Sequence, residues 1–439
     1  MGRRPSLLLM IWAVPATAAA QPTSHSTALD TALTRLTGEG RFSGAVVVRG
    51  AHGVTYARGF GLADPFTRRA FHPATPVDSA SLAKPVTAAA VLTLVQEGRV
   101  ELDAPVVRYV AEFPYAAITV RQLLTHSAGL PSFDEAEPLT GKTNADLVAG
   151  MRRRGAAPLF PPGSSFAYCN LCYDSLALLI ERVSGRSYLQ FLRGRVGLPK
   201  SAAIRPQSLA NWRGRGVGFR RTANAGIERA DSYEGEAFYG SANLSISAGA
   251  LAEWGSRWWS SLARVGSLAT APATVGGGVS GLTLGNWYCS PERSRCHYIG
   301  HHEGFHHMLY WDAERRLSVA MVTNNSLAPD LQQRLQRAIA AFATGRSREG
   351  VAELAMPLPH RQAREGSYRT SAGEVVTVQR GLGPILRLTR RGVTYDVYPV
   401  QGGIGYAPGL DVYLAQTAEG RLKILSLYED QTAERSAPD

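Results

Sequence analysis

The sequence contains no apolar run long enough to cross a bilayer, which needs about 20 consecutive apolar residues. It is also short of acidic residues, with 35 Asp and Glu against 47 Lys and Arg and a formal net charge of +12. Because the basic residues are scattered rather than grouped, no nucleic-acid-binding surface is indicated. A chain of 439 residues with 45% apolar composition can instead bury a large core and form two domains.

Cysteine is scarce as well, with four residues that allow three ways of forming two disulfides. Cys289 and Cys296 flank a polar segment, which is typical of a stapled hairpin. Cys169 and Cys172 form a Cys-x-x-Cys, for which we favour a structural disulfide over redox chemistry in an exported chain. No second pair with zinc-ligand spacing accompanies it, so we expect neither a metal nor a cofactor.

The first 20 residues have the pattern of a signal peptide. Arg3 and Arg4 precede a short apolar run from Leu7 to Pro15, and three alanines end at Ala20. We therefore expect cleavage near Ala20, a periplasmic or secreted location, and no stable membrane span afterwards.

Sheet and helix patterns alternate along the rest of the chain. Strand patterns lie at 43–60 and 282–325, with helical stretches between them and helices at 26–36 and 328–342. This order predicts an α/β (α+β) domain over residues 21–344, in which helices flank a central antiparallel sheet and a helical domain is inserted.

The end of the chain has a different pattern. A linker is expected at 345–359. Short alternating runs spaced by Gly-rich turns then predict a small antiparallel β domain at 360–439, in which no chemistry is visible.

Lysine is rare, since only four of the 47 basic residues are lysines. One of them, Lys84, follows Ser81 by three positions in Ser-Leu-Ala-Lys. If Ser81 begins a helix, both side chains share one face, and the Lys84 amine can take the hydroxyl proton. Pro85 fits this placement because proline is tolerated in a first helical turn. An arginine could not act as a base, so lysine at this position favours a catalytic role.

Two further segments carry polar groups suited to the same chemistry. In Tyr168-Cys169-Asn170, a phenol beside a lysine can accept a proton, and an amide can orient a substrate carbonyl. Five of the ten histidines fall between His297 and His307. Neighbours on a strand point to opposite faces, which argues against joint metal binding by His301 and His302.

In serial order, these motifs resemble the serine beta-lactamase and penicillin-binding-protein superfamily, and its class C-like branch with D-aminopeptidases and esterases in particular. The likeness includes "SASLAKPVTAAAVLTLVQEGRVELDAPV", "ITVRQLLTHSAGLP" and "FPPGSSFAYCNLCYDSLALLIERVSG" and covers most of residues 40–325. It implies Ser81 as the acylated nucleophile, Lys84 as its base, and Tyr168 and Asn170 as the Tyr-x-Asn element. The oxyanion hole would combine the Ser81 N–H with an N–H of the third-motif strand.

The third motif departs from the family pattern, which is Lys-Thr-Gly or His-x-Gly. This chain offers His301-x-Glu303, which lacks the glycine, or His302-x-Gly304, which is shifted by one. We favour His301 in the first position, followed by His302, with Gly304 as part of the substrate-binding element. Glu303 would place an acid where beta-lactamases use cations, which weakens an antibiotic-hydrolysing interpretation.

The sequence therefore predicts an exported serine hydrolase that cleaves a small-molecule or peptide ester or amide, with D-amino-acid and peptidoglycan-derived peptides among the candidates. Three alternatives stay open. They are a class C-like beta-lactamase, a catalytically silent protein that senses peptidoglycan fragments, and a metal-dependent hydrolase built on the histidine cluster. The oligomeric state is left open.

Overall fold

The computed structural model describes most of the chain. The described residues are 24–131, 141–222, 224, 226–231, 235–260, 265, 268–346, 354, 362–381, 383–400, 404–428 and 430–436. The predicted signal peptide, with its cleavage site at Ala20, lies outside them, as does most of the predicted linker at 345–359.

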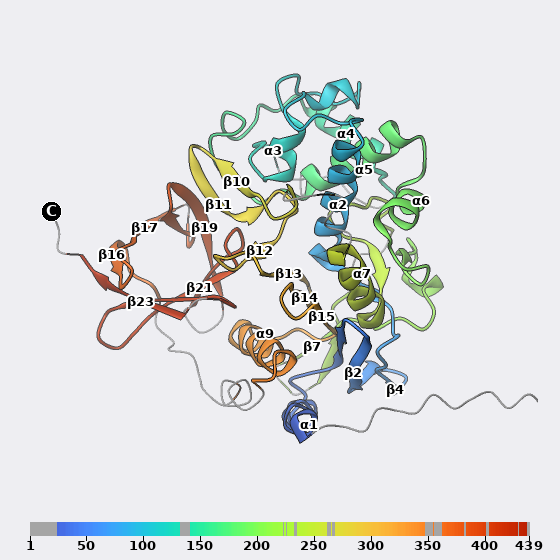
Figure 1. Ribbon diagram of the computed structural model, residues 1–439, viewed down its shortest axis with the longest axis vertical. Coiled ribbons are helices and arrows are strands. Elements are labelled where there is room, and N and C mark those ends of the chain that lie inside the picture. The colour runs from blue at the N-terminus through green and yellow to red at the C-terminus, as the bar shows by residue number, and fades with distance from the viewer. Residues whose placement is uncertain are drawn as a thin grey trace, which may run out of the picture.

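An eight-stranded antiparallel sheet forms the centre of the first domain (Figure 1). Its strand order brings the two ends of the domain sequence together, because β15 pairs with β1. In spatial order the strands are β10 (Pro272–Val275), β11 (Gly278–Thr283), β12 (Tyr288–Cys289), β13 (Arg295–His302), β14 (Phe305–Asp312), β15 (Leu317–Thr323), β1 (Gly44–Gly50) and β2 (Gly53–Phe60).

Helices cover both faces of this sheet, and the period-2 alternation of β1 assigns its side chains to them. Val46 and Val48 belong to a core cluster with α1 (Ser24–Gly38) and α9 (Pro329–Ala343). Ala45 and Val47 belong to a second cluster that includes α2 (Ala83–Gln96) and α7 (Ala248–Ser260). Both faces are therefore buried.

The helical part packs beside α2. It contains α3 (Val120–Leu124), α4 (Asn144–Arg154), α5 (Asn170–Ser184) and α6 (Tyr188–Phe191). Nearly every residue of α2 is buried, as expected for a helix that is apolar all round and crosses the middle of a domain. Gly98 follows its end with φ +69°, a conformation that glycine adopts without strain.

Short strands position the segments around the N-terminus of α2. β5 (Val77–Asp78) and β6 (Ala203–Ile204) both pair with β9 (Leu244–Ile246). Two ribbons lie at the surface: β3 (Leu62–Asp64) with β4 (Arg69–Ala70), and β7 (Phe219–Arg221) with β8 (Ile227–Arg229).

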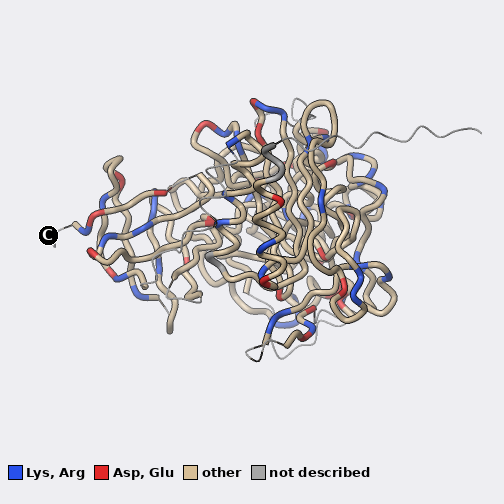
Figure 2. The backbone as a smooth tube through the Cα atoms, turned by 90° about the horizontal axis from the view of Figure 1, so that it is seen from below, with Lys and Arg blue, Asp and Glu red and all other residues tan. Residues whose placement is uncertain are grey.

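The C-terminal strands form a closed barrel, which projects to the left in Figure 1. Aliphatic and tyrosine side chains fill its interior. Basic and acidic residues are interspersed over both domains in Figure 2. The strands are β16 (Gly366–Thr370), β17 (Val375–Arg380), β18 (Leu386–Arg390), β19 (Val393–Val400), β20 (Ile404–Ala407), β21 (Val412–Gln416), β22 (Leu422–Leu425) and β23 (Asp430–Arg435).

The predicted fold class is confirmed, with an antiparallel sheet flanked by helices, a helical region and a C-terminal β domain. Both favoured disulfides are present, Cys169–Cys172 and Cys289–Cys296. Within the described residues, no helix combines the length and the apolar character that a bilayer span requires.

Candidate active site

Ser81 lies at a strained turn between β5 and α2. The preceding residue, Ala80, has φ +45°, which a residue with a side chain rarely adopts. Its N–H donates to Asp78 Oδ1 at 2.8 Å, and the buried Asp78 also pairs with Arg205 at 2.9 Å. A short 3₁₀ turn, η1 (Ala80–Leu82), then leads into α2. Ser81 therefore lies in this 3₁₀ turn, two residues before Ala83, the first α-helical residue.

Two proton-carrying side chains converge on the Ser81 hydroxyl. The Lys84 Nζ lies 3.1 Å from Ser81 Oγ, and the Tyr168 hydroxyl lies 2.9 Å from the same atom. Lys84 is fully buried, and its Nζ also donates to the main-chain oxygen of Ser241 at 3.0 Å. The three residues predicted to carry the chemistry are thus in mutual hydrogen-bonding contact.

The charge of Lys84 acts directly on Tyr168. Burial raises the pKa of Tyr168, but the Lys84 charge and hydrogen bonds outweigh burial, so that its pKa lies below the ordinary value. The Lys84 Nζ lies 4.8 Å from the centre of the Tyr168 ring. A phenol whose ionised form is stabilised in this way is suited to accept a proton.

Tyr298 of β13 is a site residue that the sequence analysis missed. Its hydroxyl lies 3.3 Å from that of Tyr168. Burial and the Tyr168 charge raise the pKa of Tyr298 well above its ordinary value. Tyr298 therefore keeps its proton and can donate it in a hydrogen bond to an ionised Tyr168. The signal was available, since Tyr298-Ile299-Gly300 has the same first-x-Gly spacing as the family's third motif.

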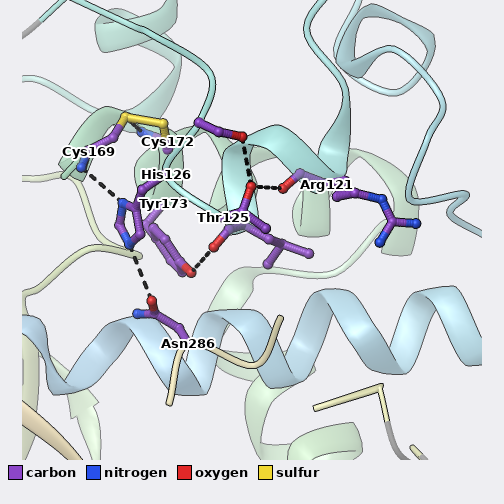
Figure 3. The surroundings of a disulfide bond; sticks show 9 residues. Arg121, Thr125, His126, Cys169, Cys172, Tyr173 and Asn286 are labelled. Carbon is purple, nitrogen blue, oxygen red and sulfur yellow. Dashed lines mark hydrogen bonds between the residues drawn. A yellow bond between two sulfur atoms is a disulfide. The ribbon is translucent and has the colours of Figure 1, made fainter. Parts of the chain in front are cut away.

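A buried histidine, His126, packs against Tyr168, and Figure 3 shows its ring hydrogen-bonded to Cys169 of the Cys169–Cys172 disulfide and to Asn286. The His126 ring stacks on Tyr168 with centroids 4.7 Å apart. Its Nδ1 accepts the Cys169 N–H at 2.9 Å, and its Nε2 faces Asn286 Oδ1 at 3.2 Å. Burial and the nearby Lys84 charge lower the pKa of His126 to about 3, so the ring is neutral.

The site face of β13 contains Tyr298, Gly300 and His302. A Cβ on Gly300 would lie 2.7 Å from Ser79 O and 3.1 Å from Leu82 N, so only glycine lets the strand approach η1 this closely. Along the edge of β13 that faces away from β14, β12 pairs only with Cys296 and His297. The strand beyond Tyr298 is therefore left open toward Ser81 in the described structure.

The two histidines of the predicted third motif point to different faces. Burial, followed by the Lys84 charge, lowers the pKa of His302 to about 3. The His301 ring lies on the other face, 4.3 Å from that of His306. The geometry favours His302 over His301 for a side-chain contact with substrate, and the binding role of either remains a prediction.

The other predicted binding residues have different surroundings. Gly304 makes the tight β13–β14 turn with φ +77° and donates its N–H to Ser326 Oγ at 3.1 Å. Glu303 points outward and pairs with Arg220 at 2.7 Å, so it places no acid beside Ser81. Asn170 is exposed at the first position of α5, and its role in orienting a substrate stays a prediction.

The remaining histidines of the cluster have separate partners. His297 contacts Asp411 of the barrel at 2.6 Å, His306 contacts Gln332 at 2.8 Å, and His307 contacts the main-chain oxygen of Asp78 at 2.7 Å. Among the described residues, no three His, Cys, Asp or Glu side chains are grouped as metal ligands would be. The geometry gives no support to the metal-dependent alternative.

Fold and site together define an α/β protein in which a buried lysine and a tyrosine are both hydrogen-bonded to one serine hydroxyl at the edge of an antiparallel sheet. The chain belongs to the beta-lactamase family, whose model matches residues 29–344. The resemblance to the serine beta-lactamase and penicillin-binding-protein superfamily is thereby confirmed.

Several known proteins are similar to parts or all of this chain. It is 36% identical to esterase EstB of Burkholderia gladioli in an alignment of 178 positions that covers 36% of this chain and 45% of the esterase. The chain matches less than half the length of such curated relatives.

Two solved structures share the fold. An octameric penicillin-binding protein homologue from Pyrococcus abyssi covers 94% of this chain and 100% of its own, at 19% identity and a TM-score of 0.60. A D-amino acid amidase from Ochrobactrum anthropi SV3 with D-phenylalanine covers 76% and 99% at 17% identity and a TM-score of 0.58.

Proposed function

We propose that the protein is an exported serine hydrolase that cleaves an ester or amide through an acyl-enzyme on Ser81, with Lys84 as the base. The observation that carries this proposal is the convergence of Lys84 Nζ and the Tyr168 hydroxyl on Ser81 Oγ, at 3.1 and 2.9 Å. A nucleophile within hydrogen-bonding distance of a base, which is itself oriented by a third group, is the arrangement that activates a serine.

In the acylation step, neutral Lys84 takes the proton of Ser81 as Oγ attacks the substrate carbonyl. The oxyanion is stabilised by the Ser81 N–H and an N–H on the open edge of β13 beside Gly300. Collapse of the tetrahedral intermediate breaks the ester or amide bond. The proton passes through Tyr168 to the leaving alcohol or amine, and the acyl group stays on Ser81.

In the deacylation step, water takes the place of the leaving group. Transfer of the Tyr168 proton to Lys84 gives a phenolate beside a charged lysine. The Lys84 charge stabilises this phenolate, which accepts a proton from the water, and Tyr298 donates a hydrogen bond to the same oxygen. The second tetrahedral intermediate then collapses to release the acid and to return the proton to Ser81.

Within this class we rank esters and D-amino-acid amides or peptides above beta-lactams. A cation usually binds the beta-lactam carboxylate at the third motif, but this chain has Tyr298 and a His302 that stays neutral. The similar esterase and D-amino acid amidase support the same ranking. Peptidoglycan-derived peptides are one candidate source of such groups.

Export is the part of the proposal that rests on the first 20 residues, with their paired arginines, apolar run and alanines. The two disulfides support it, because disulfides persist in oxidising compartments.

A single purified sample tests the proposal. Incubation with a fluorophosphonate, followed by intact-mass and peptide analysis, is expected to give one adduct on Ser81 and none in Ser81→Ala. Turnover of p-nitrophenyl esters, D-amino-acid amides and nitrocefin then ranks the substrate classes. An adduct on another residue, or an active Ser81→Ala variant, contradicts the assignment. Absence of any adduct favours the silent sensor.

A further inference from the structure

A buried carboxyl group lies behind Lys84 and has no part in the mechanism above. Asp174 belongs to α5 and is 1% exposed. Its Oδ1 accepts the Ser241 N–H at 3.0 Å, whereas its Oδ2 is buried without a hydrogen-bond partner among the described residues. An asparagine at this position could accept the same N–H. This hydrogen bond alone therefore does not require the ionisable carboxyl group of an aspartate.

Ser241 connects this carboxyl to the catalytic lysine. Its N–H binds Asp174, and its main-chain oxygen accepts from Lys84 Nζ at 3.0 Å. Gly240 lets the segment fit between α2 and α5, because a Cβ there would lie 2.4 Å from Tyr173 O. The Gly240 oxygen also accepts from Thr87 of α2 at 2.7 Å. Asp174 and Lys84 thus bind the N–H and the main-chain oxygen of the same residue, Ser241, which is held in place by its packing between α2 and α5.

We propose that Asp174 is a positioning residue that controls the proton on Lys84. When ionised, it holds the Ser241 carbonyl against Nζ and stabilises the ammonium form; when protonated, it leaves the amine free to act as a base. This inference rests on the proposed function, in which Lys84 deprotonates Ser81.

Asp174 titrates in the range where such control matters. Burial raises its pKa to about 7, while the Ser241 side chain and N–H and the Lys84 charge act in the opposite direction. The charged and titratable groups that face it are Lys84 of α2, Tyr188 of α6 and Glu236 of the segment before Ser241. Of these, Lys84 alone is a cation, so ionised Asp174 favours a proton there.

The test follows the rate of Ser81 labelling by a fluorophosphonate between pH 5 and pH 10. Wild-type labelling is expected to rise with pH, because the proposed base acts only in its neutral form. Asp174→Asn keeps the Ser241 hydrogen bond and removes the charge, so the rise is expected at a pH lower by about one unit. Ser241→Ala removes only the hydroxyl that favours ionised Asp174, and a smaller shift in the same direction is expected.

Asn144→Ala is the matched control. The Asn144 amide binds the Asp174 and Tyr239 main-chain oxygens and so braces the same segment without a charge. The Asn144→Ala variant is expected to be less stable but to keep the same midpoint in the plot of labelling rate against pH. The inference is overturned if Asp174→Asn leaves the midpoint unchanged, or if Asn144→Ala moves it equally. A wild-type Ser81 that is never labelled instead overturns the proposed function, and this inference with it.

Discussion

At the scale of single residues, the proposed base can be separated from a simple cation. Lys84→Arg keeps a positive charge beside Ser81, but a guanidinium does not lose its proton at any useful pH. We therefore expect Lys84→Arg to lose kcat/KM nearly as completely as Lys84→Ala, by at least about 10²-fold. Steady-state kinetics on the best ester or amide substrate measure this. An active Lys84→Arg with the wild-type pH profile would assign the proton transfer to Tyr168.

The two tyrosines are expected to differ in the same assay. Tyr168→Phe removes the hydroxyl that contacts Ser81 and should lower kcat by about 10²-fold or more. Tyr298→Phe removes a hydrogen bond to Tyr168 and keeps the stacking on Tyr288, whose ring centre is 5.5 Å away. A smaller loss of about 3- to 10-fold is expected, because one hydrogen bond is worth about 1 kcal/mol. Equal losses would show that Tyr298 itself transfers protons.

The residues predicted from the sequence are those whose chemistry is local or carried by a motif. Ser81 and Lys84 are three positions apart, and Tyr168 lies in a recognisable Tyr-x-Asn element. Tyr298 was missed because the third motif was assigned to the histidines that begin three residues further along the strand. Asp174 was missed because it sits inside an apolar helix, and its link to Lys84 exists only through Ser241 in the folded chain.

At the scale of elements, the Cys169–Cys172 disulfide fixes the start of α5 directly after Tyr168. Its replacement by two serines removes the bridge beside the Cys169 N–H that binds His126. We expect a loss of about 2 kcal/mol in unfolding free energy for so short a loop, together with a lower kcat as Tyr168 loses its support. Denaturant unfolding and kinetics on the same samples measure both effects.

The second disulfide provides the control. Cys289 and Cys296 are directly opposite each other in β12 and β13, and their replacement by serines should cost similar stability. A fall in kcat is expected for the first pair and a much smaller one for the second. Equal falls would mean that the loss reflects general loosening rather than the position of Tyr168.

Elements with local signals were predicted well, and closure of the barrel was not. The helix α2 follows from a nearly continuous apolar run that ends before Gly98, and the strand pair β1–β2 follows from strand patterns joined by turn residues. The barrel closes because β16 pairs with β23, whose partners are more than 60 residues apart. The alternating runs on which the β domain was predicted lie between residues 375 and 428 and include neither strand. Alternation within a strand also does not determine which distant strand it pairs with.

At the scale of the whole molecule, buried histidines predict sensitivity to acid. Burial lowers the pKa of His126 and His302 to about 3 and that of His307 to about 4, whereas the unfolded chain protonates them near 6.5. The unfolded state therefore binds more protons as pH falls below 6.5, and stability present above that pH is lost. Denaturant unfolding is expected to give a free energy several kcal/mol lower at pH 5 than at pH 7. A flat profile would contradict the burial of these rings as neutral groups.

Asp174 contributes with the opposite sign. Its pKa is raised from 3.8 to about 7, so the folded state keeps a proton that the unfolded state has released. Stability from this group is present below pH 4 and is lost as pH rises through 7. The unfolding free energy of Asp174→Asn minus that of the wild type should therefore increase between pH 5 and pH 8. A difference that stays constant with pH would show that Asp174 ionises normally.

The barrel is also joined to the catalytic site, through the turn between β20 and β21. Tyr288 donates to the Pro408 main-chain oxygen, and the Phe166 ring lies 5.3 Å from that of Tyr395. A Cβ on Gly409 would lie 2.5 Å from the Phe166 ring and 2.6 Å from that of Tyr395. The space for Phe166 therefore depends on a glycine of the other domain.

Gly409→Ala is accordingly expected to displace Phe166, which lies two residues before Tyr168, and to lower kcat several-fold in a protein that still folds. Gly420→Ala is the control. Gly420 lies in a barrel turn with φ +84°, and a Cβ there would have open space around it. The substitution strains the backbone and should cost about 1 kcal/mol of stability without changing kcat. If both variants leave kcat unchanged, the barrel only packs against the catalytic domain. If both lower it equally, barrel stability rather than the Phe166 contact limits the activity.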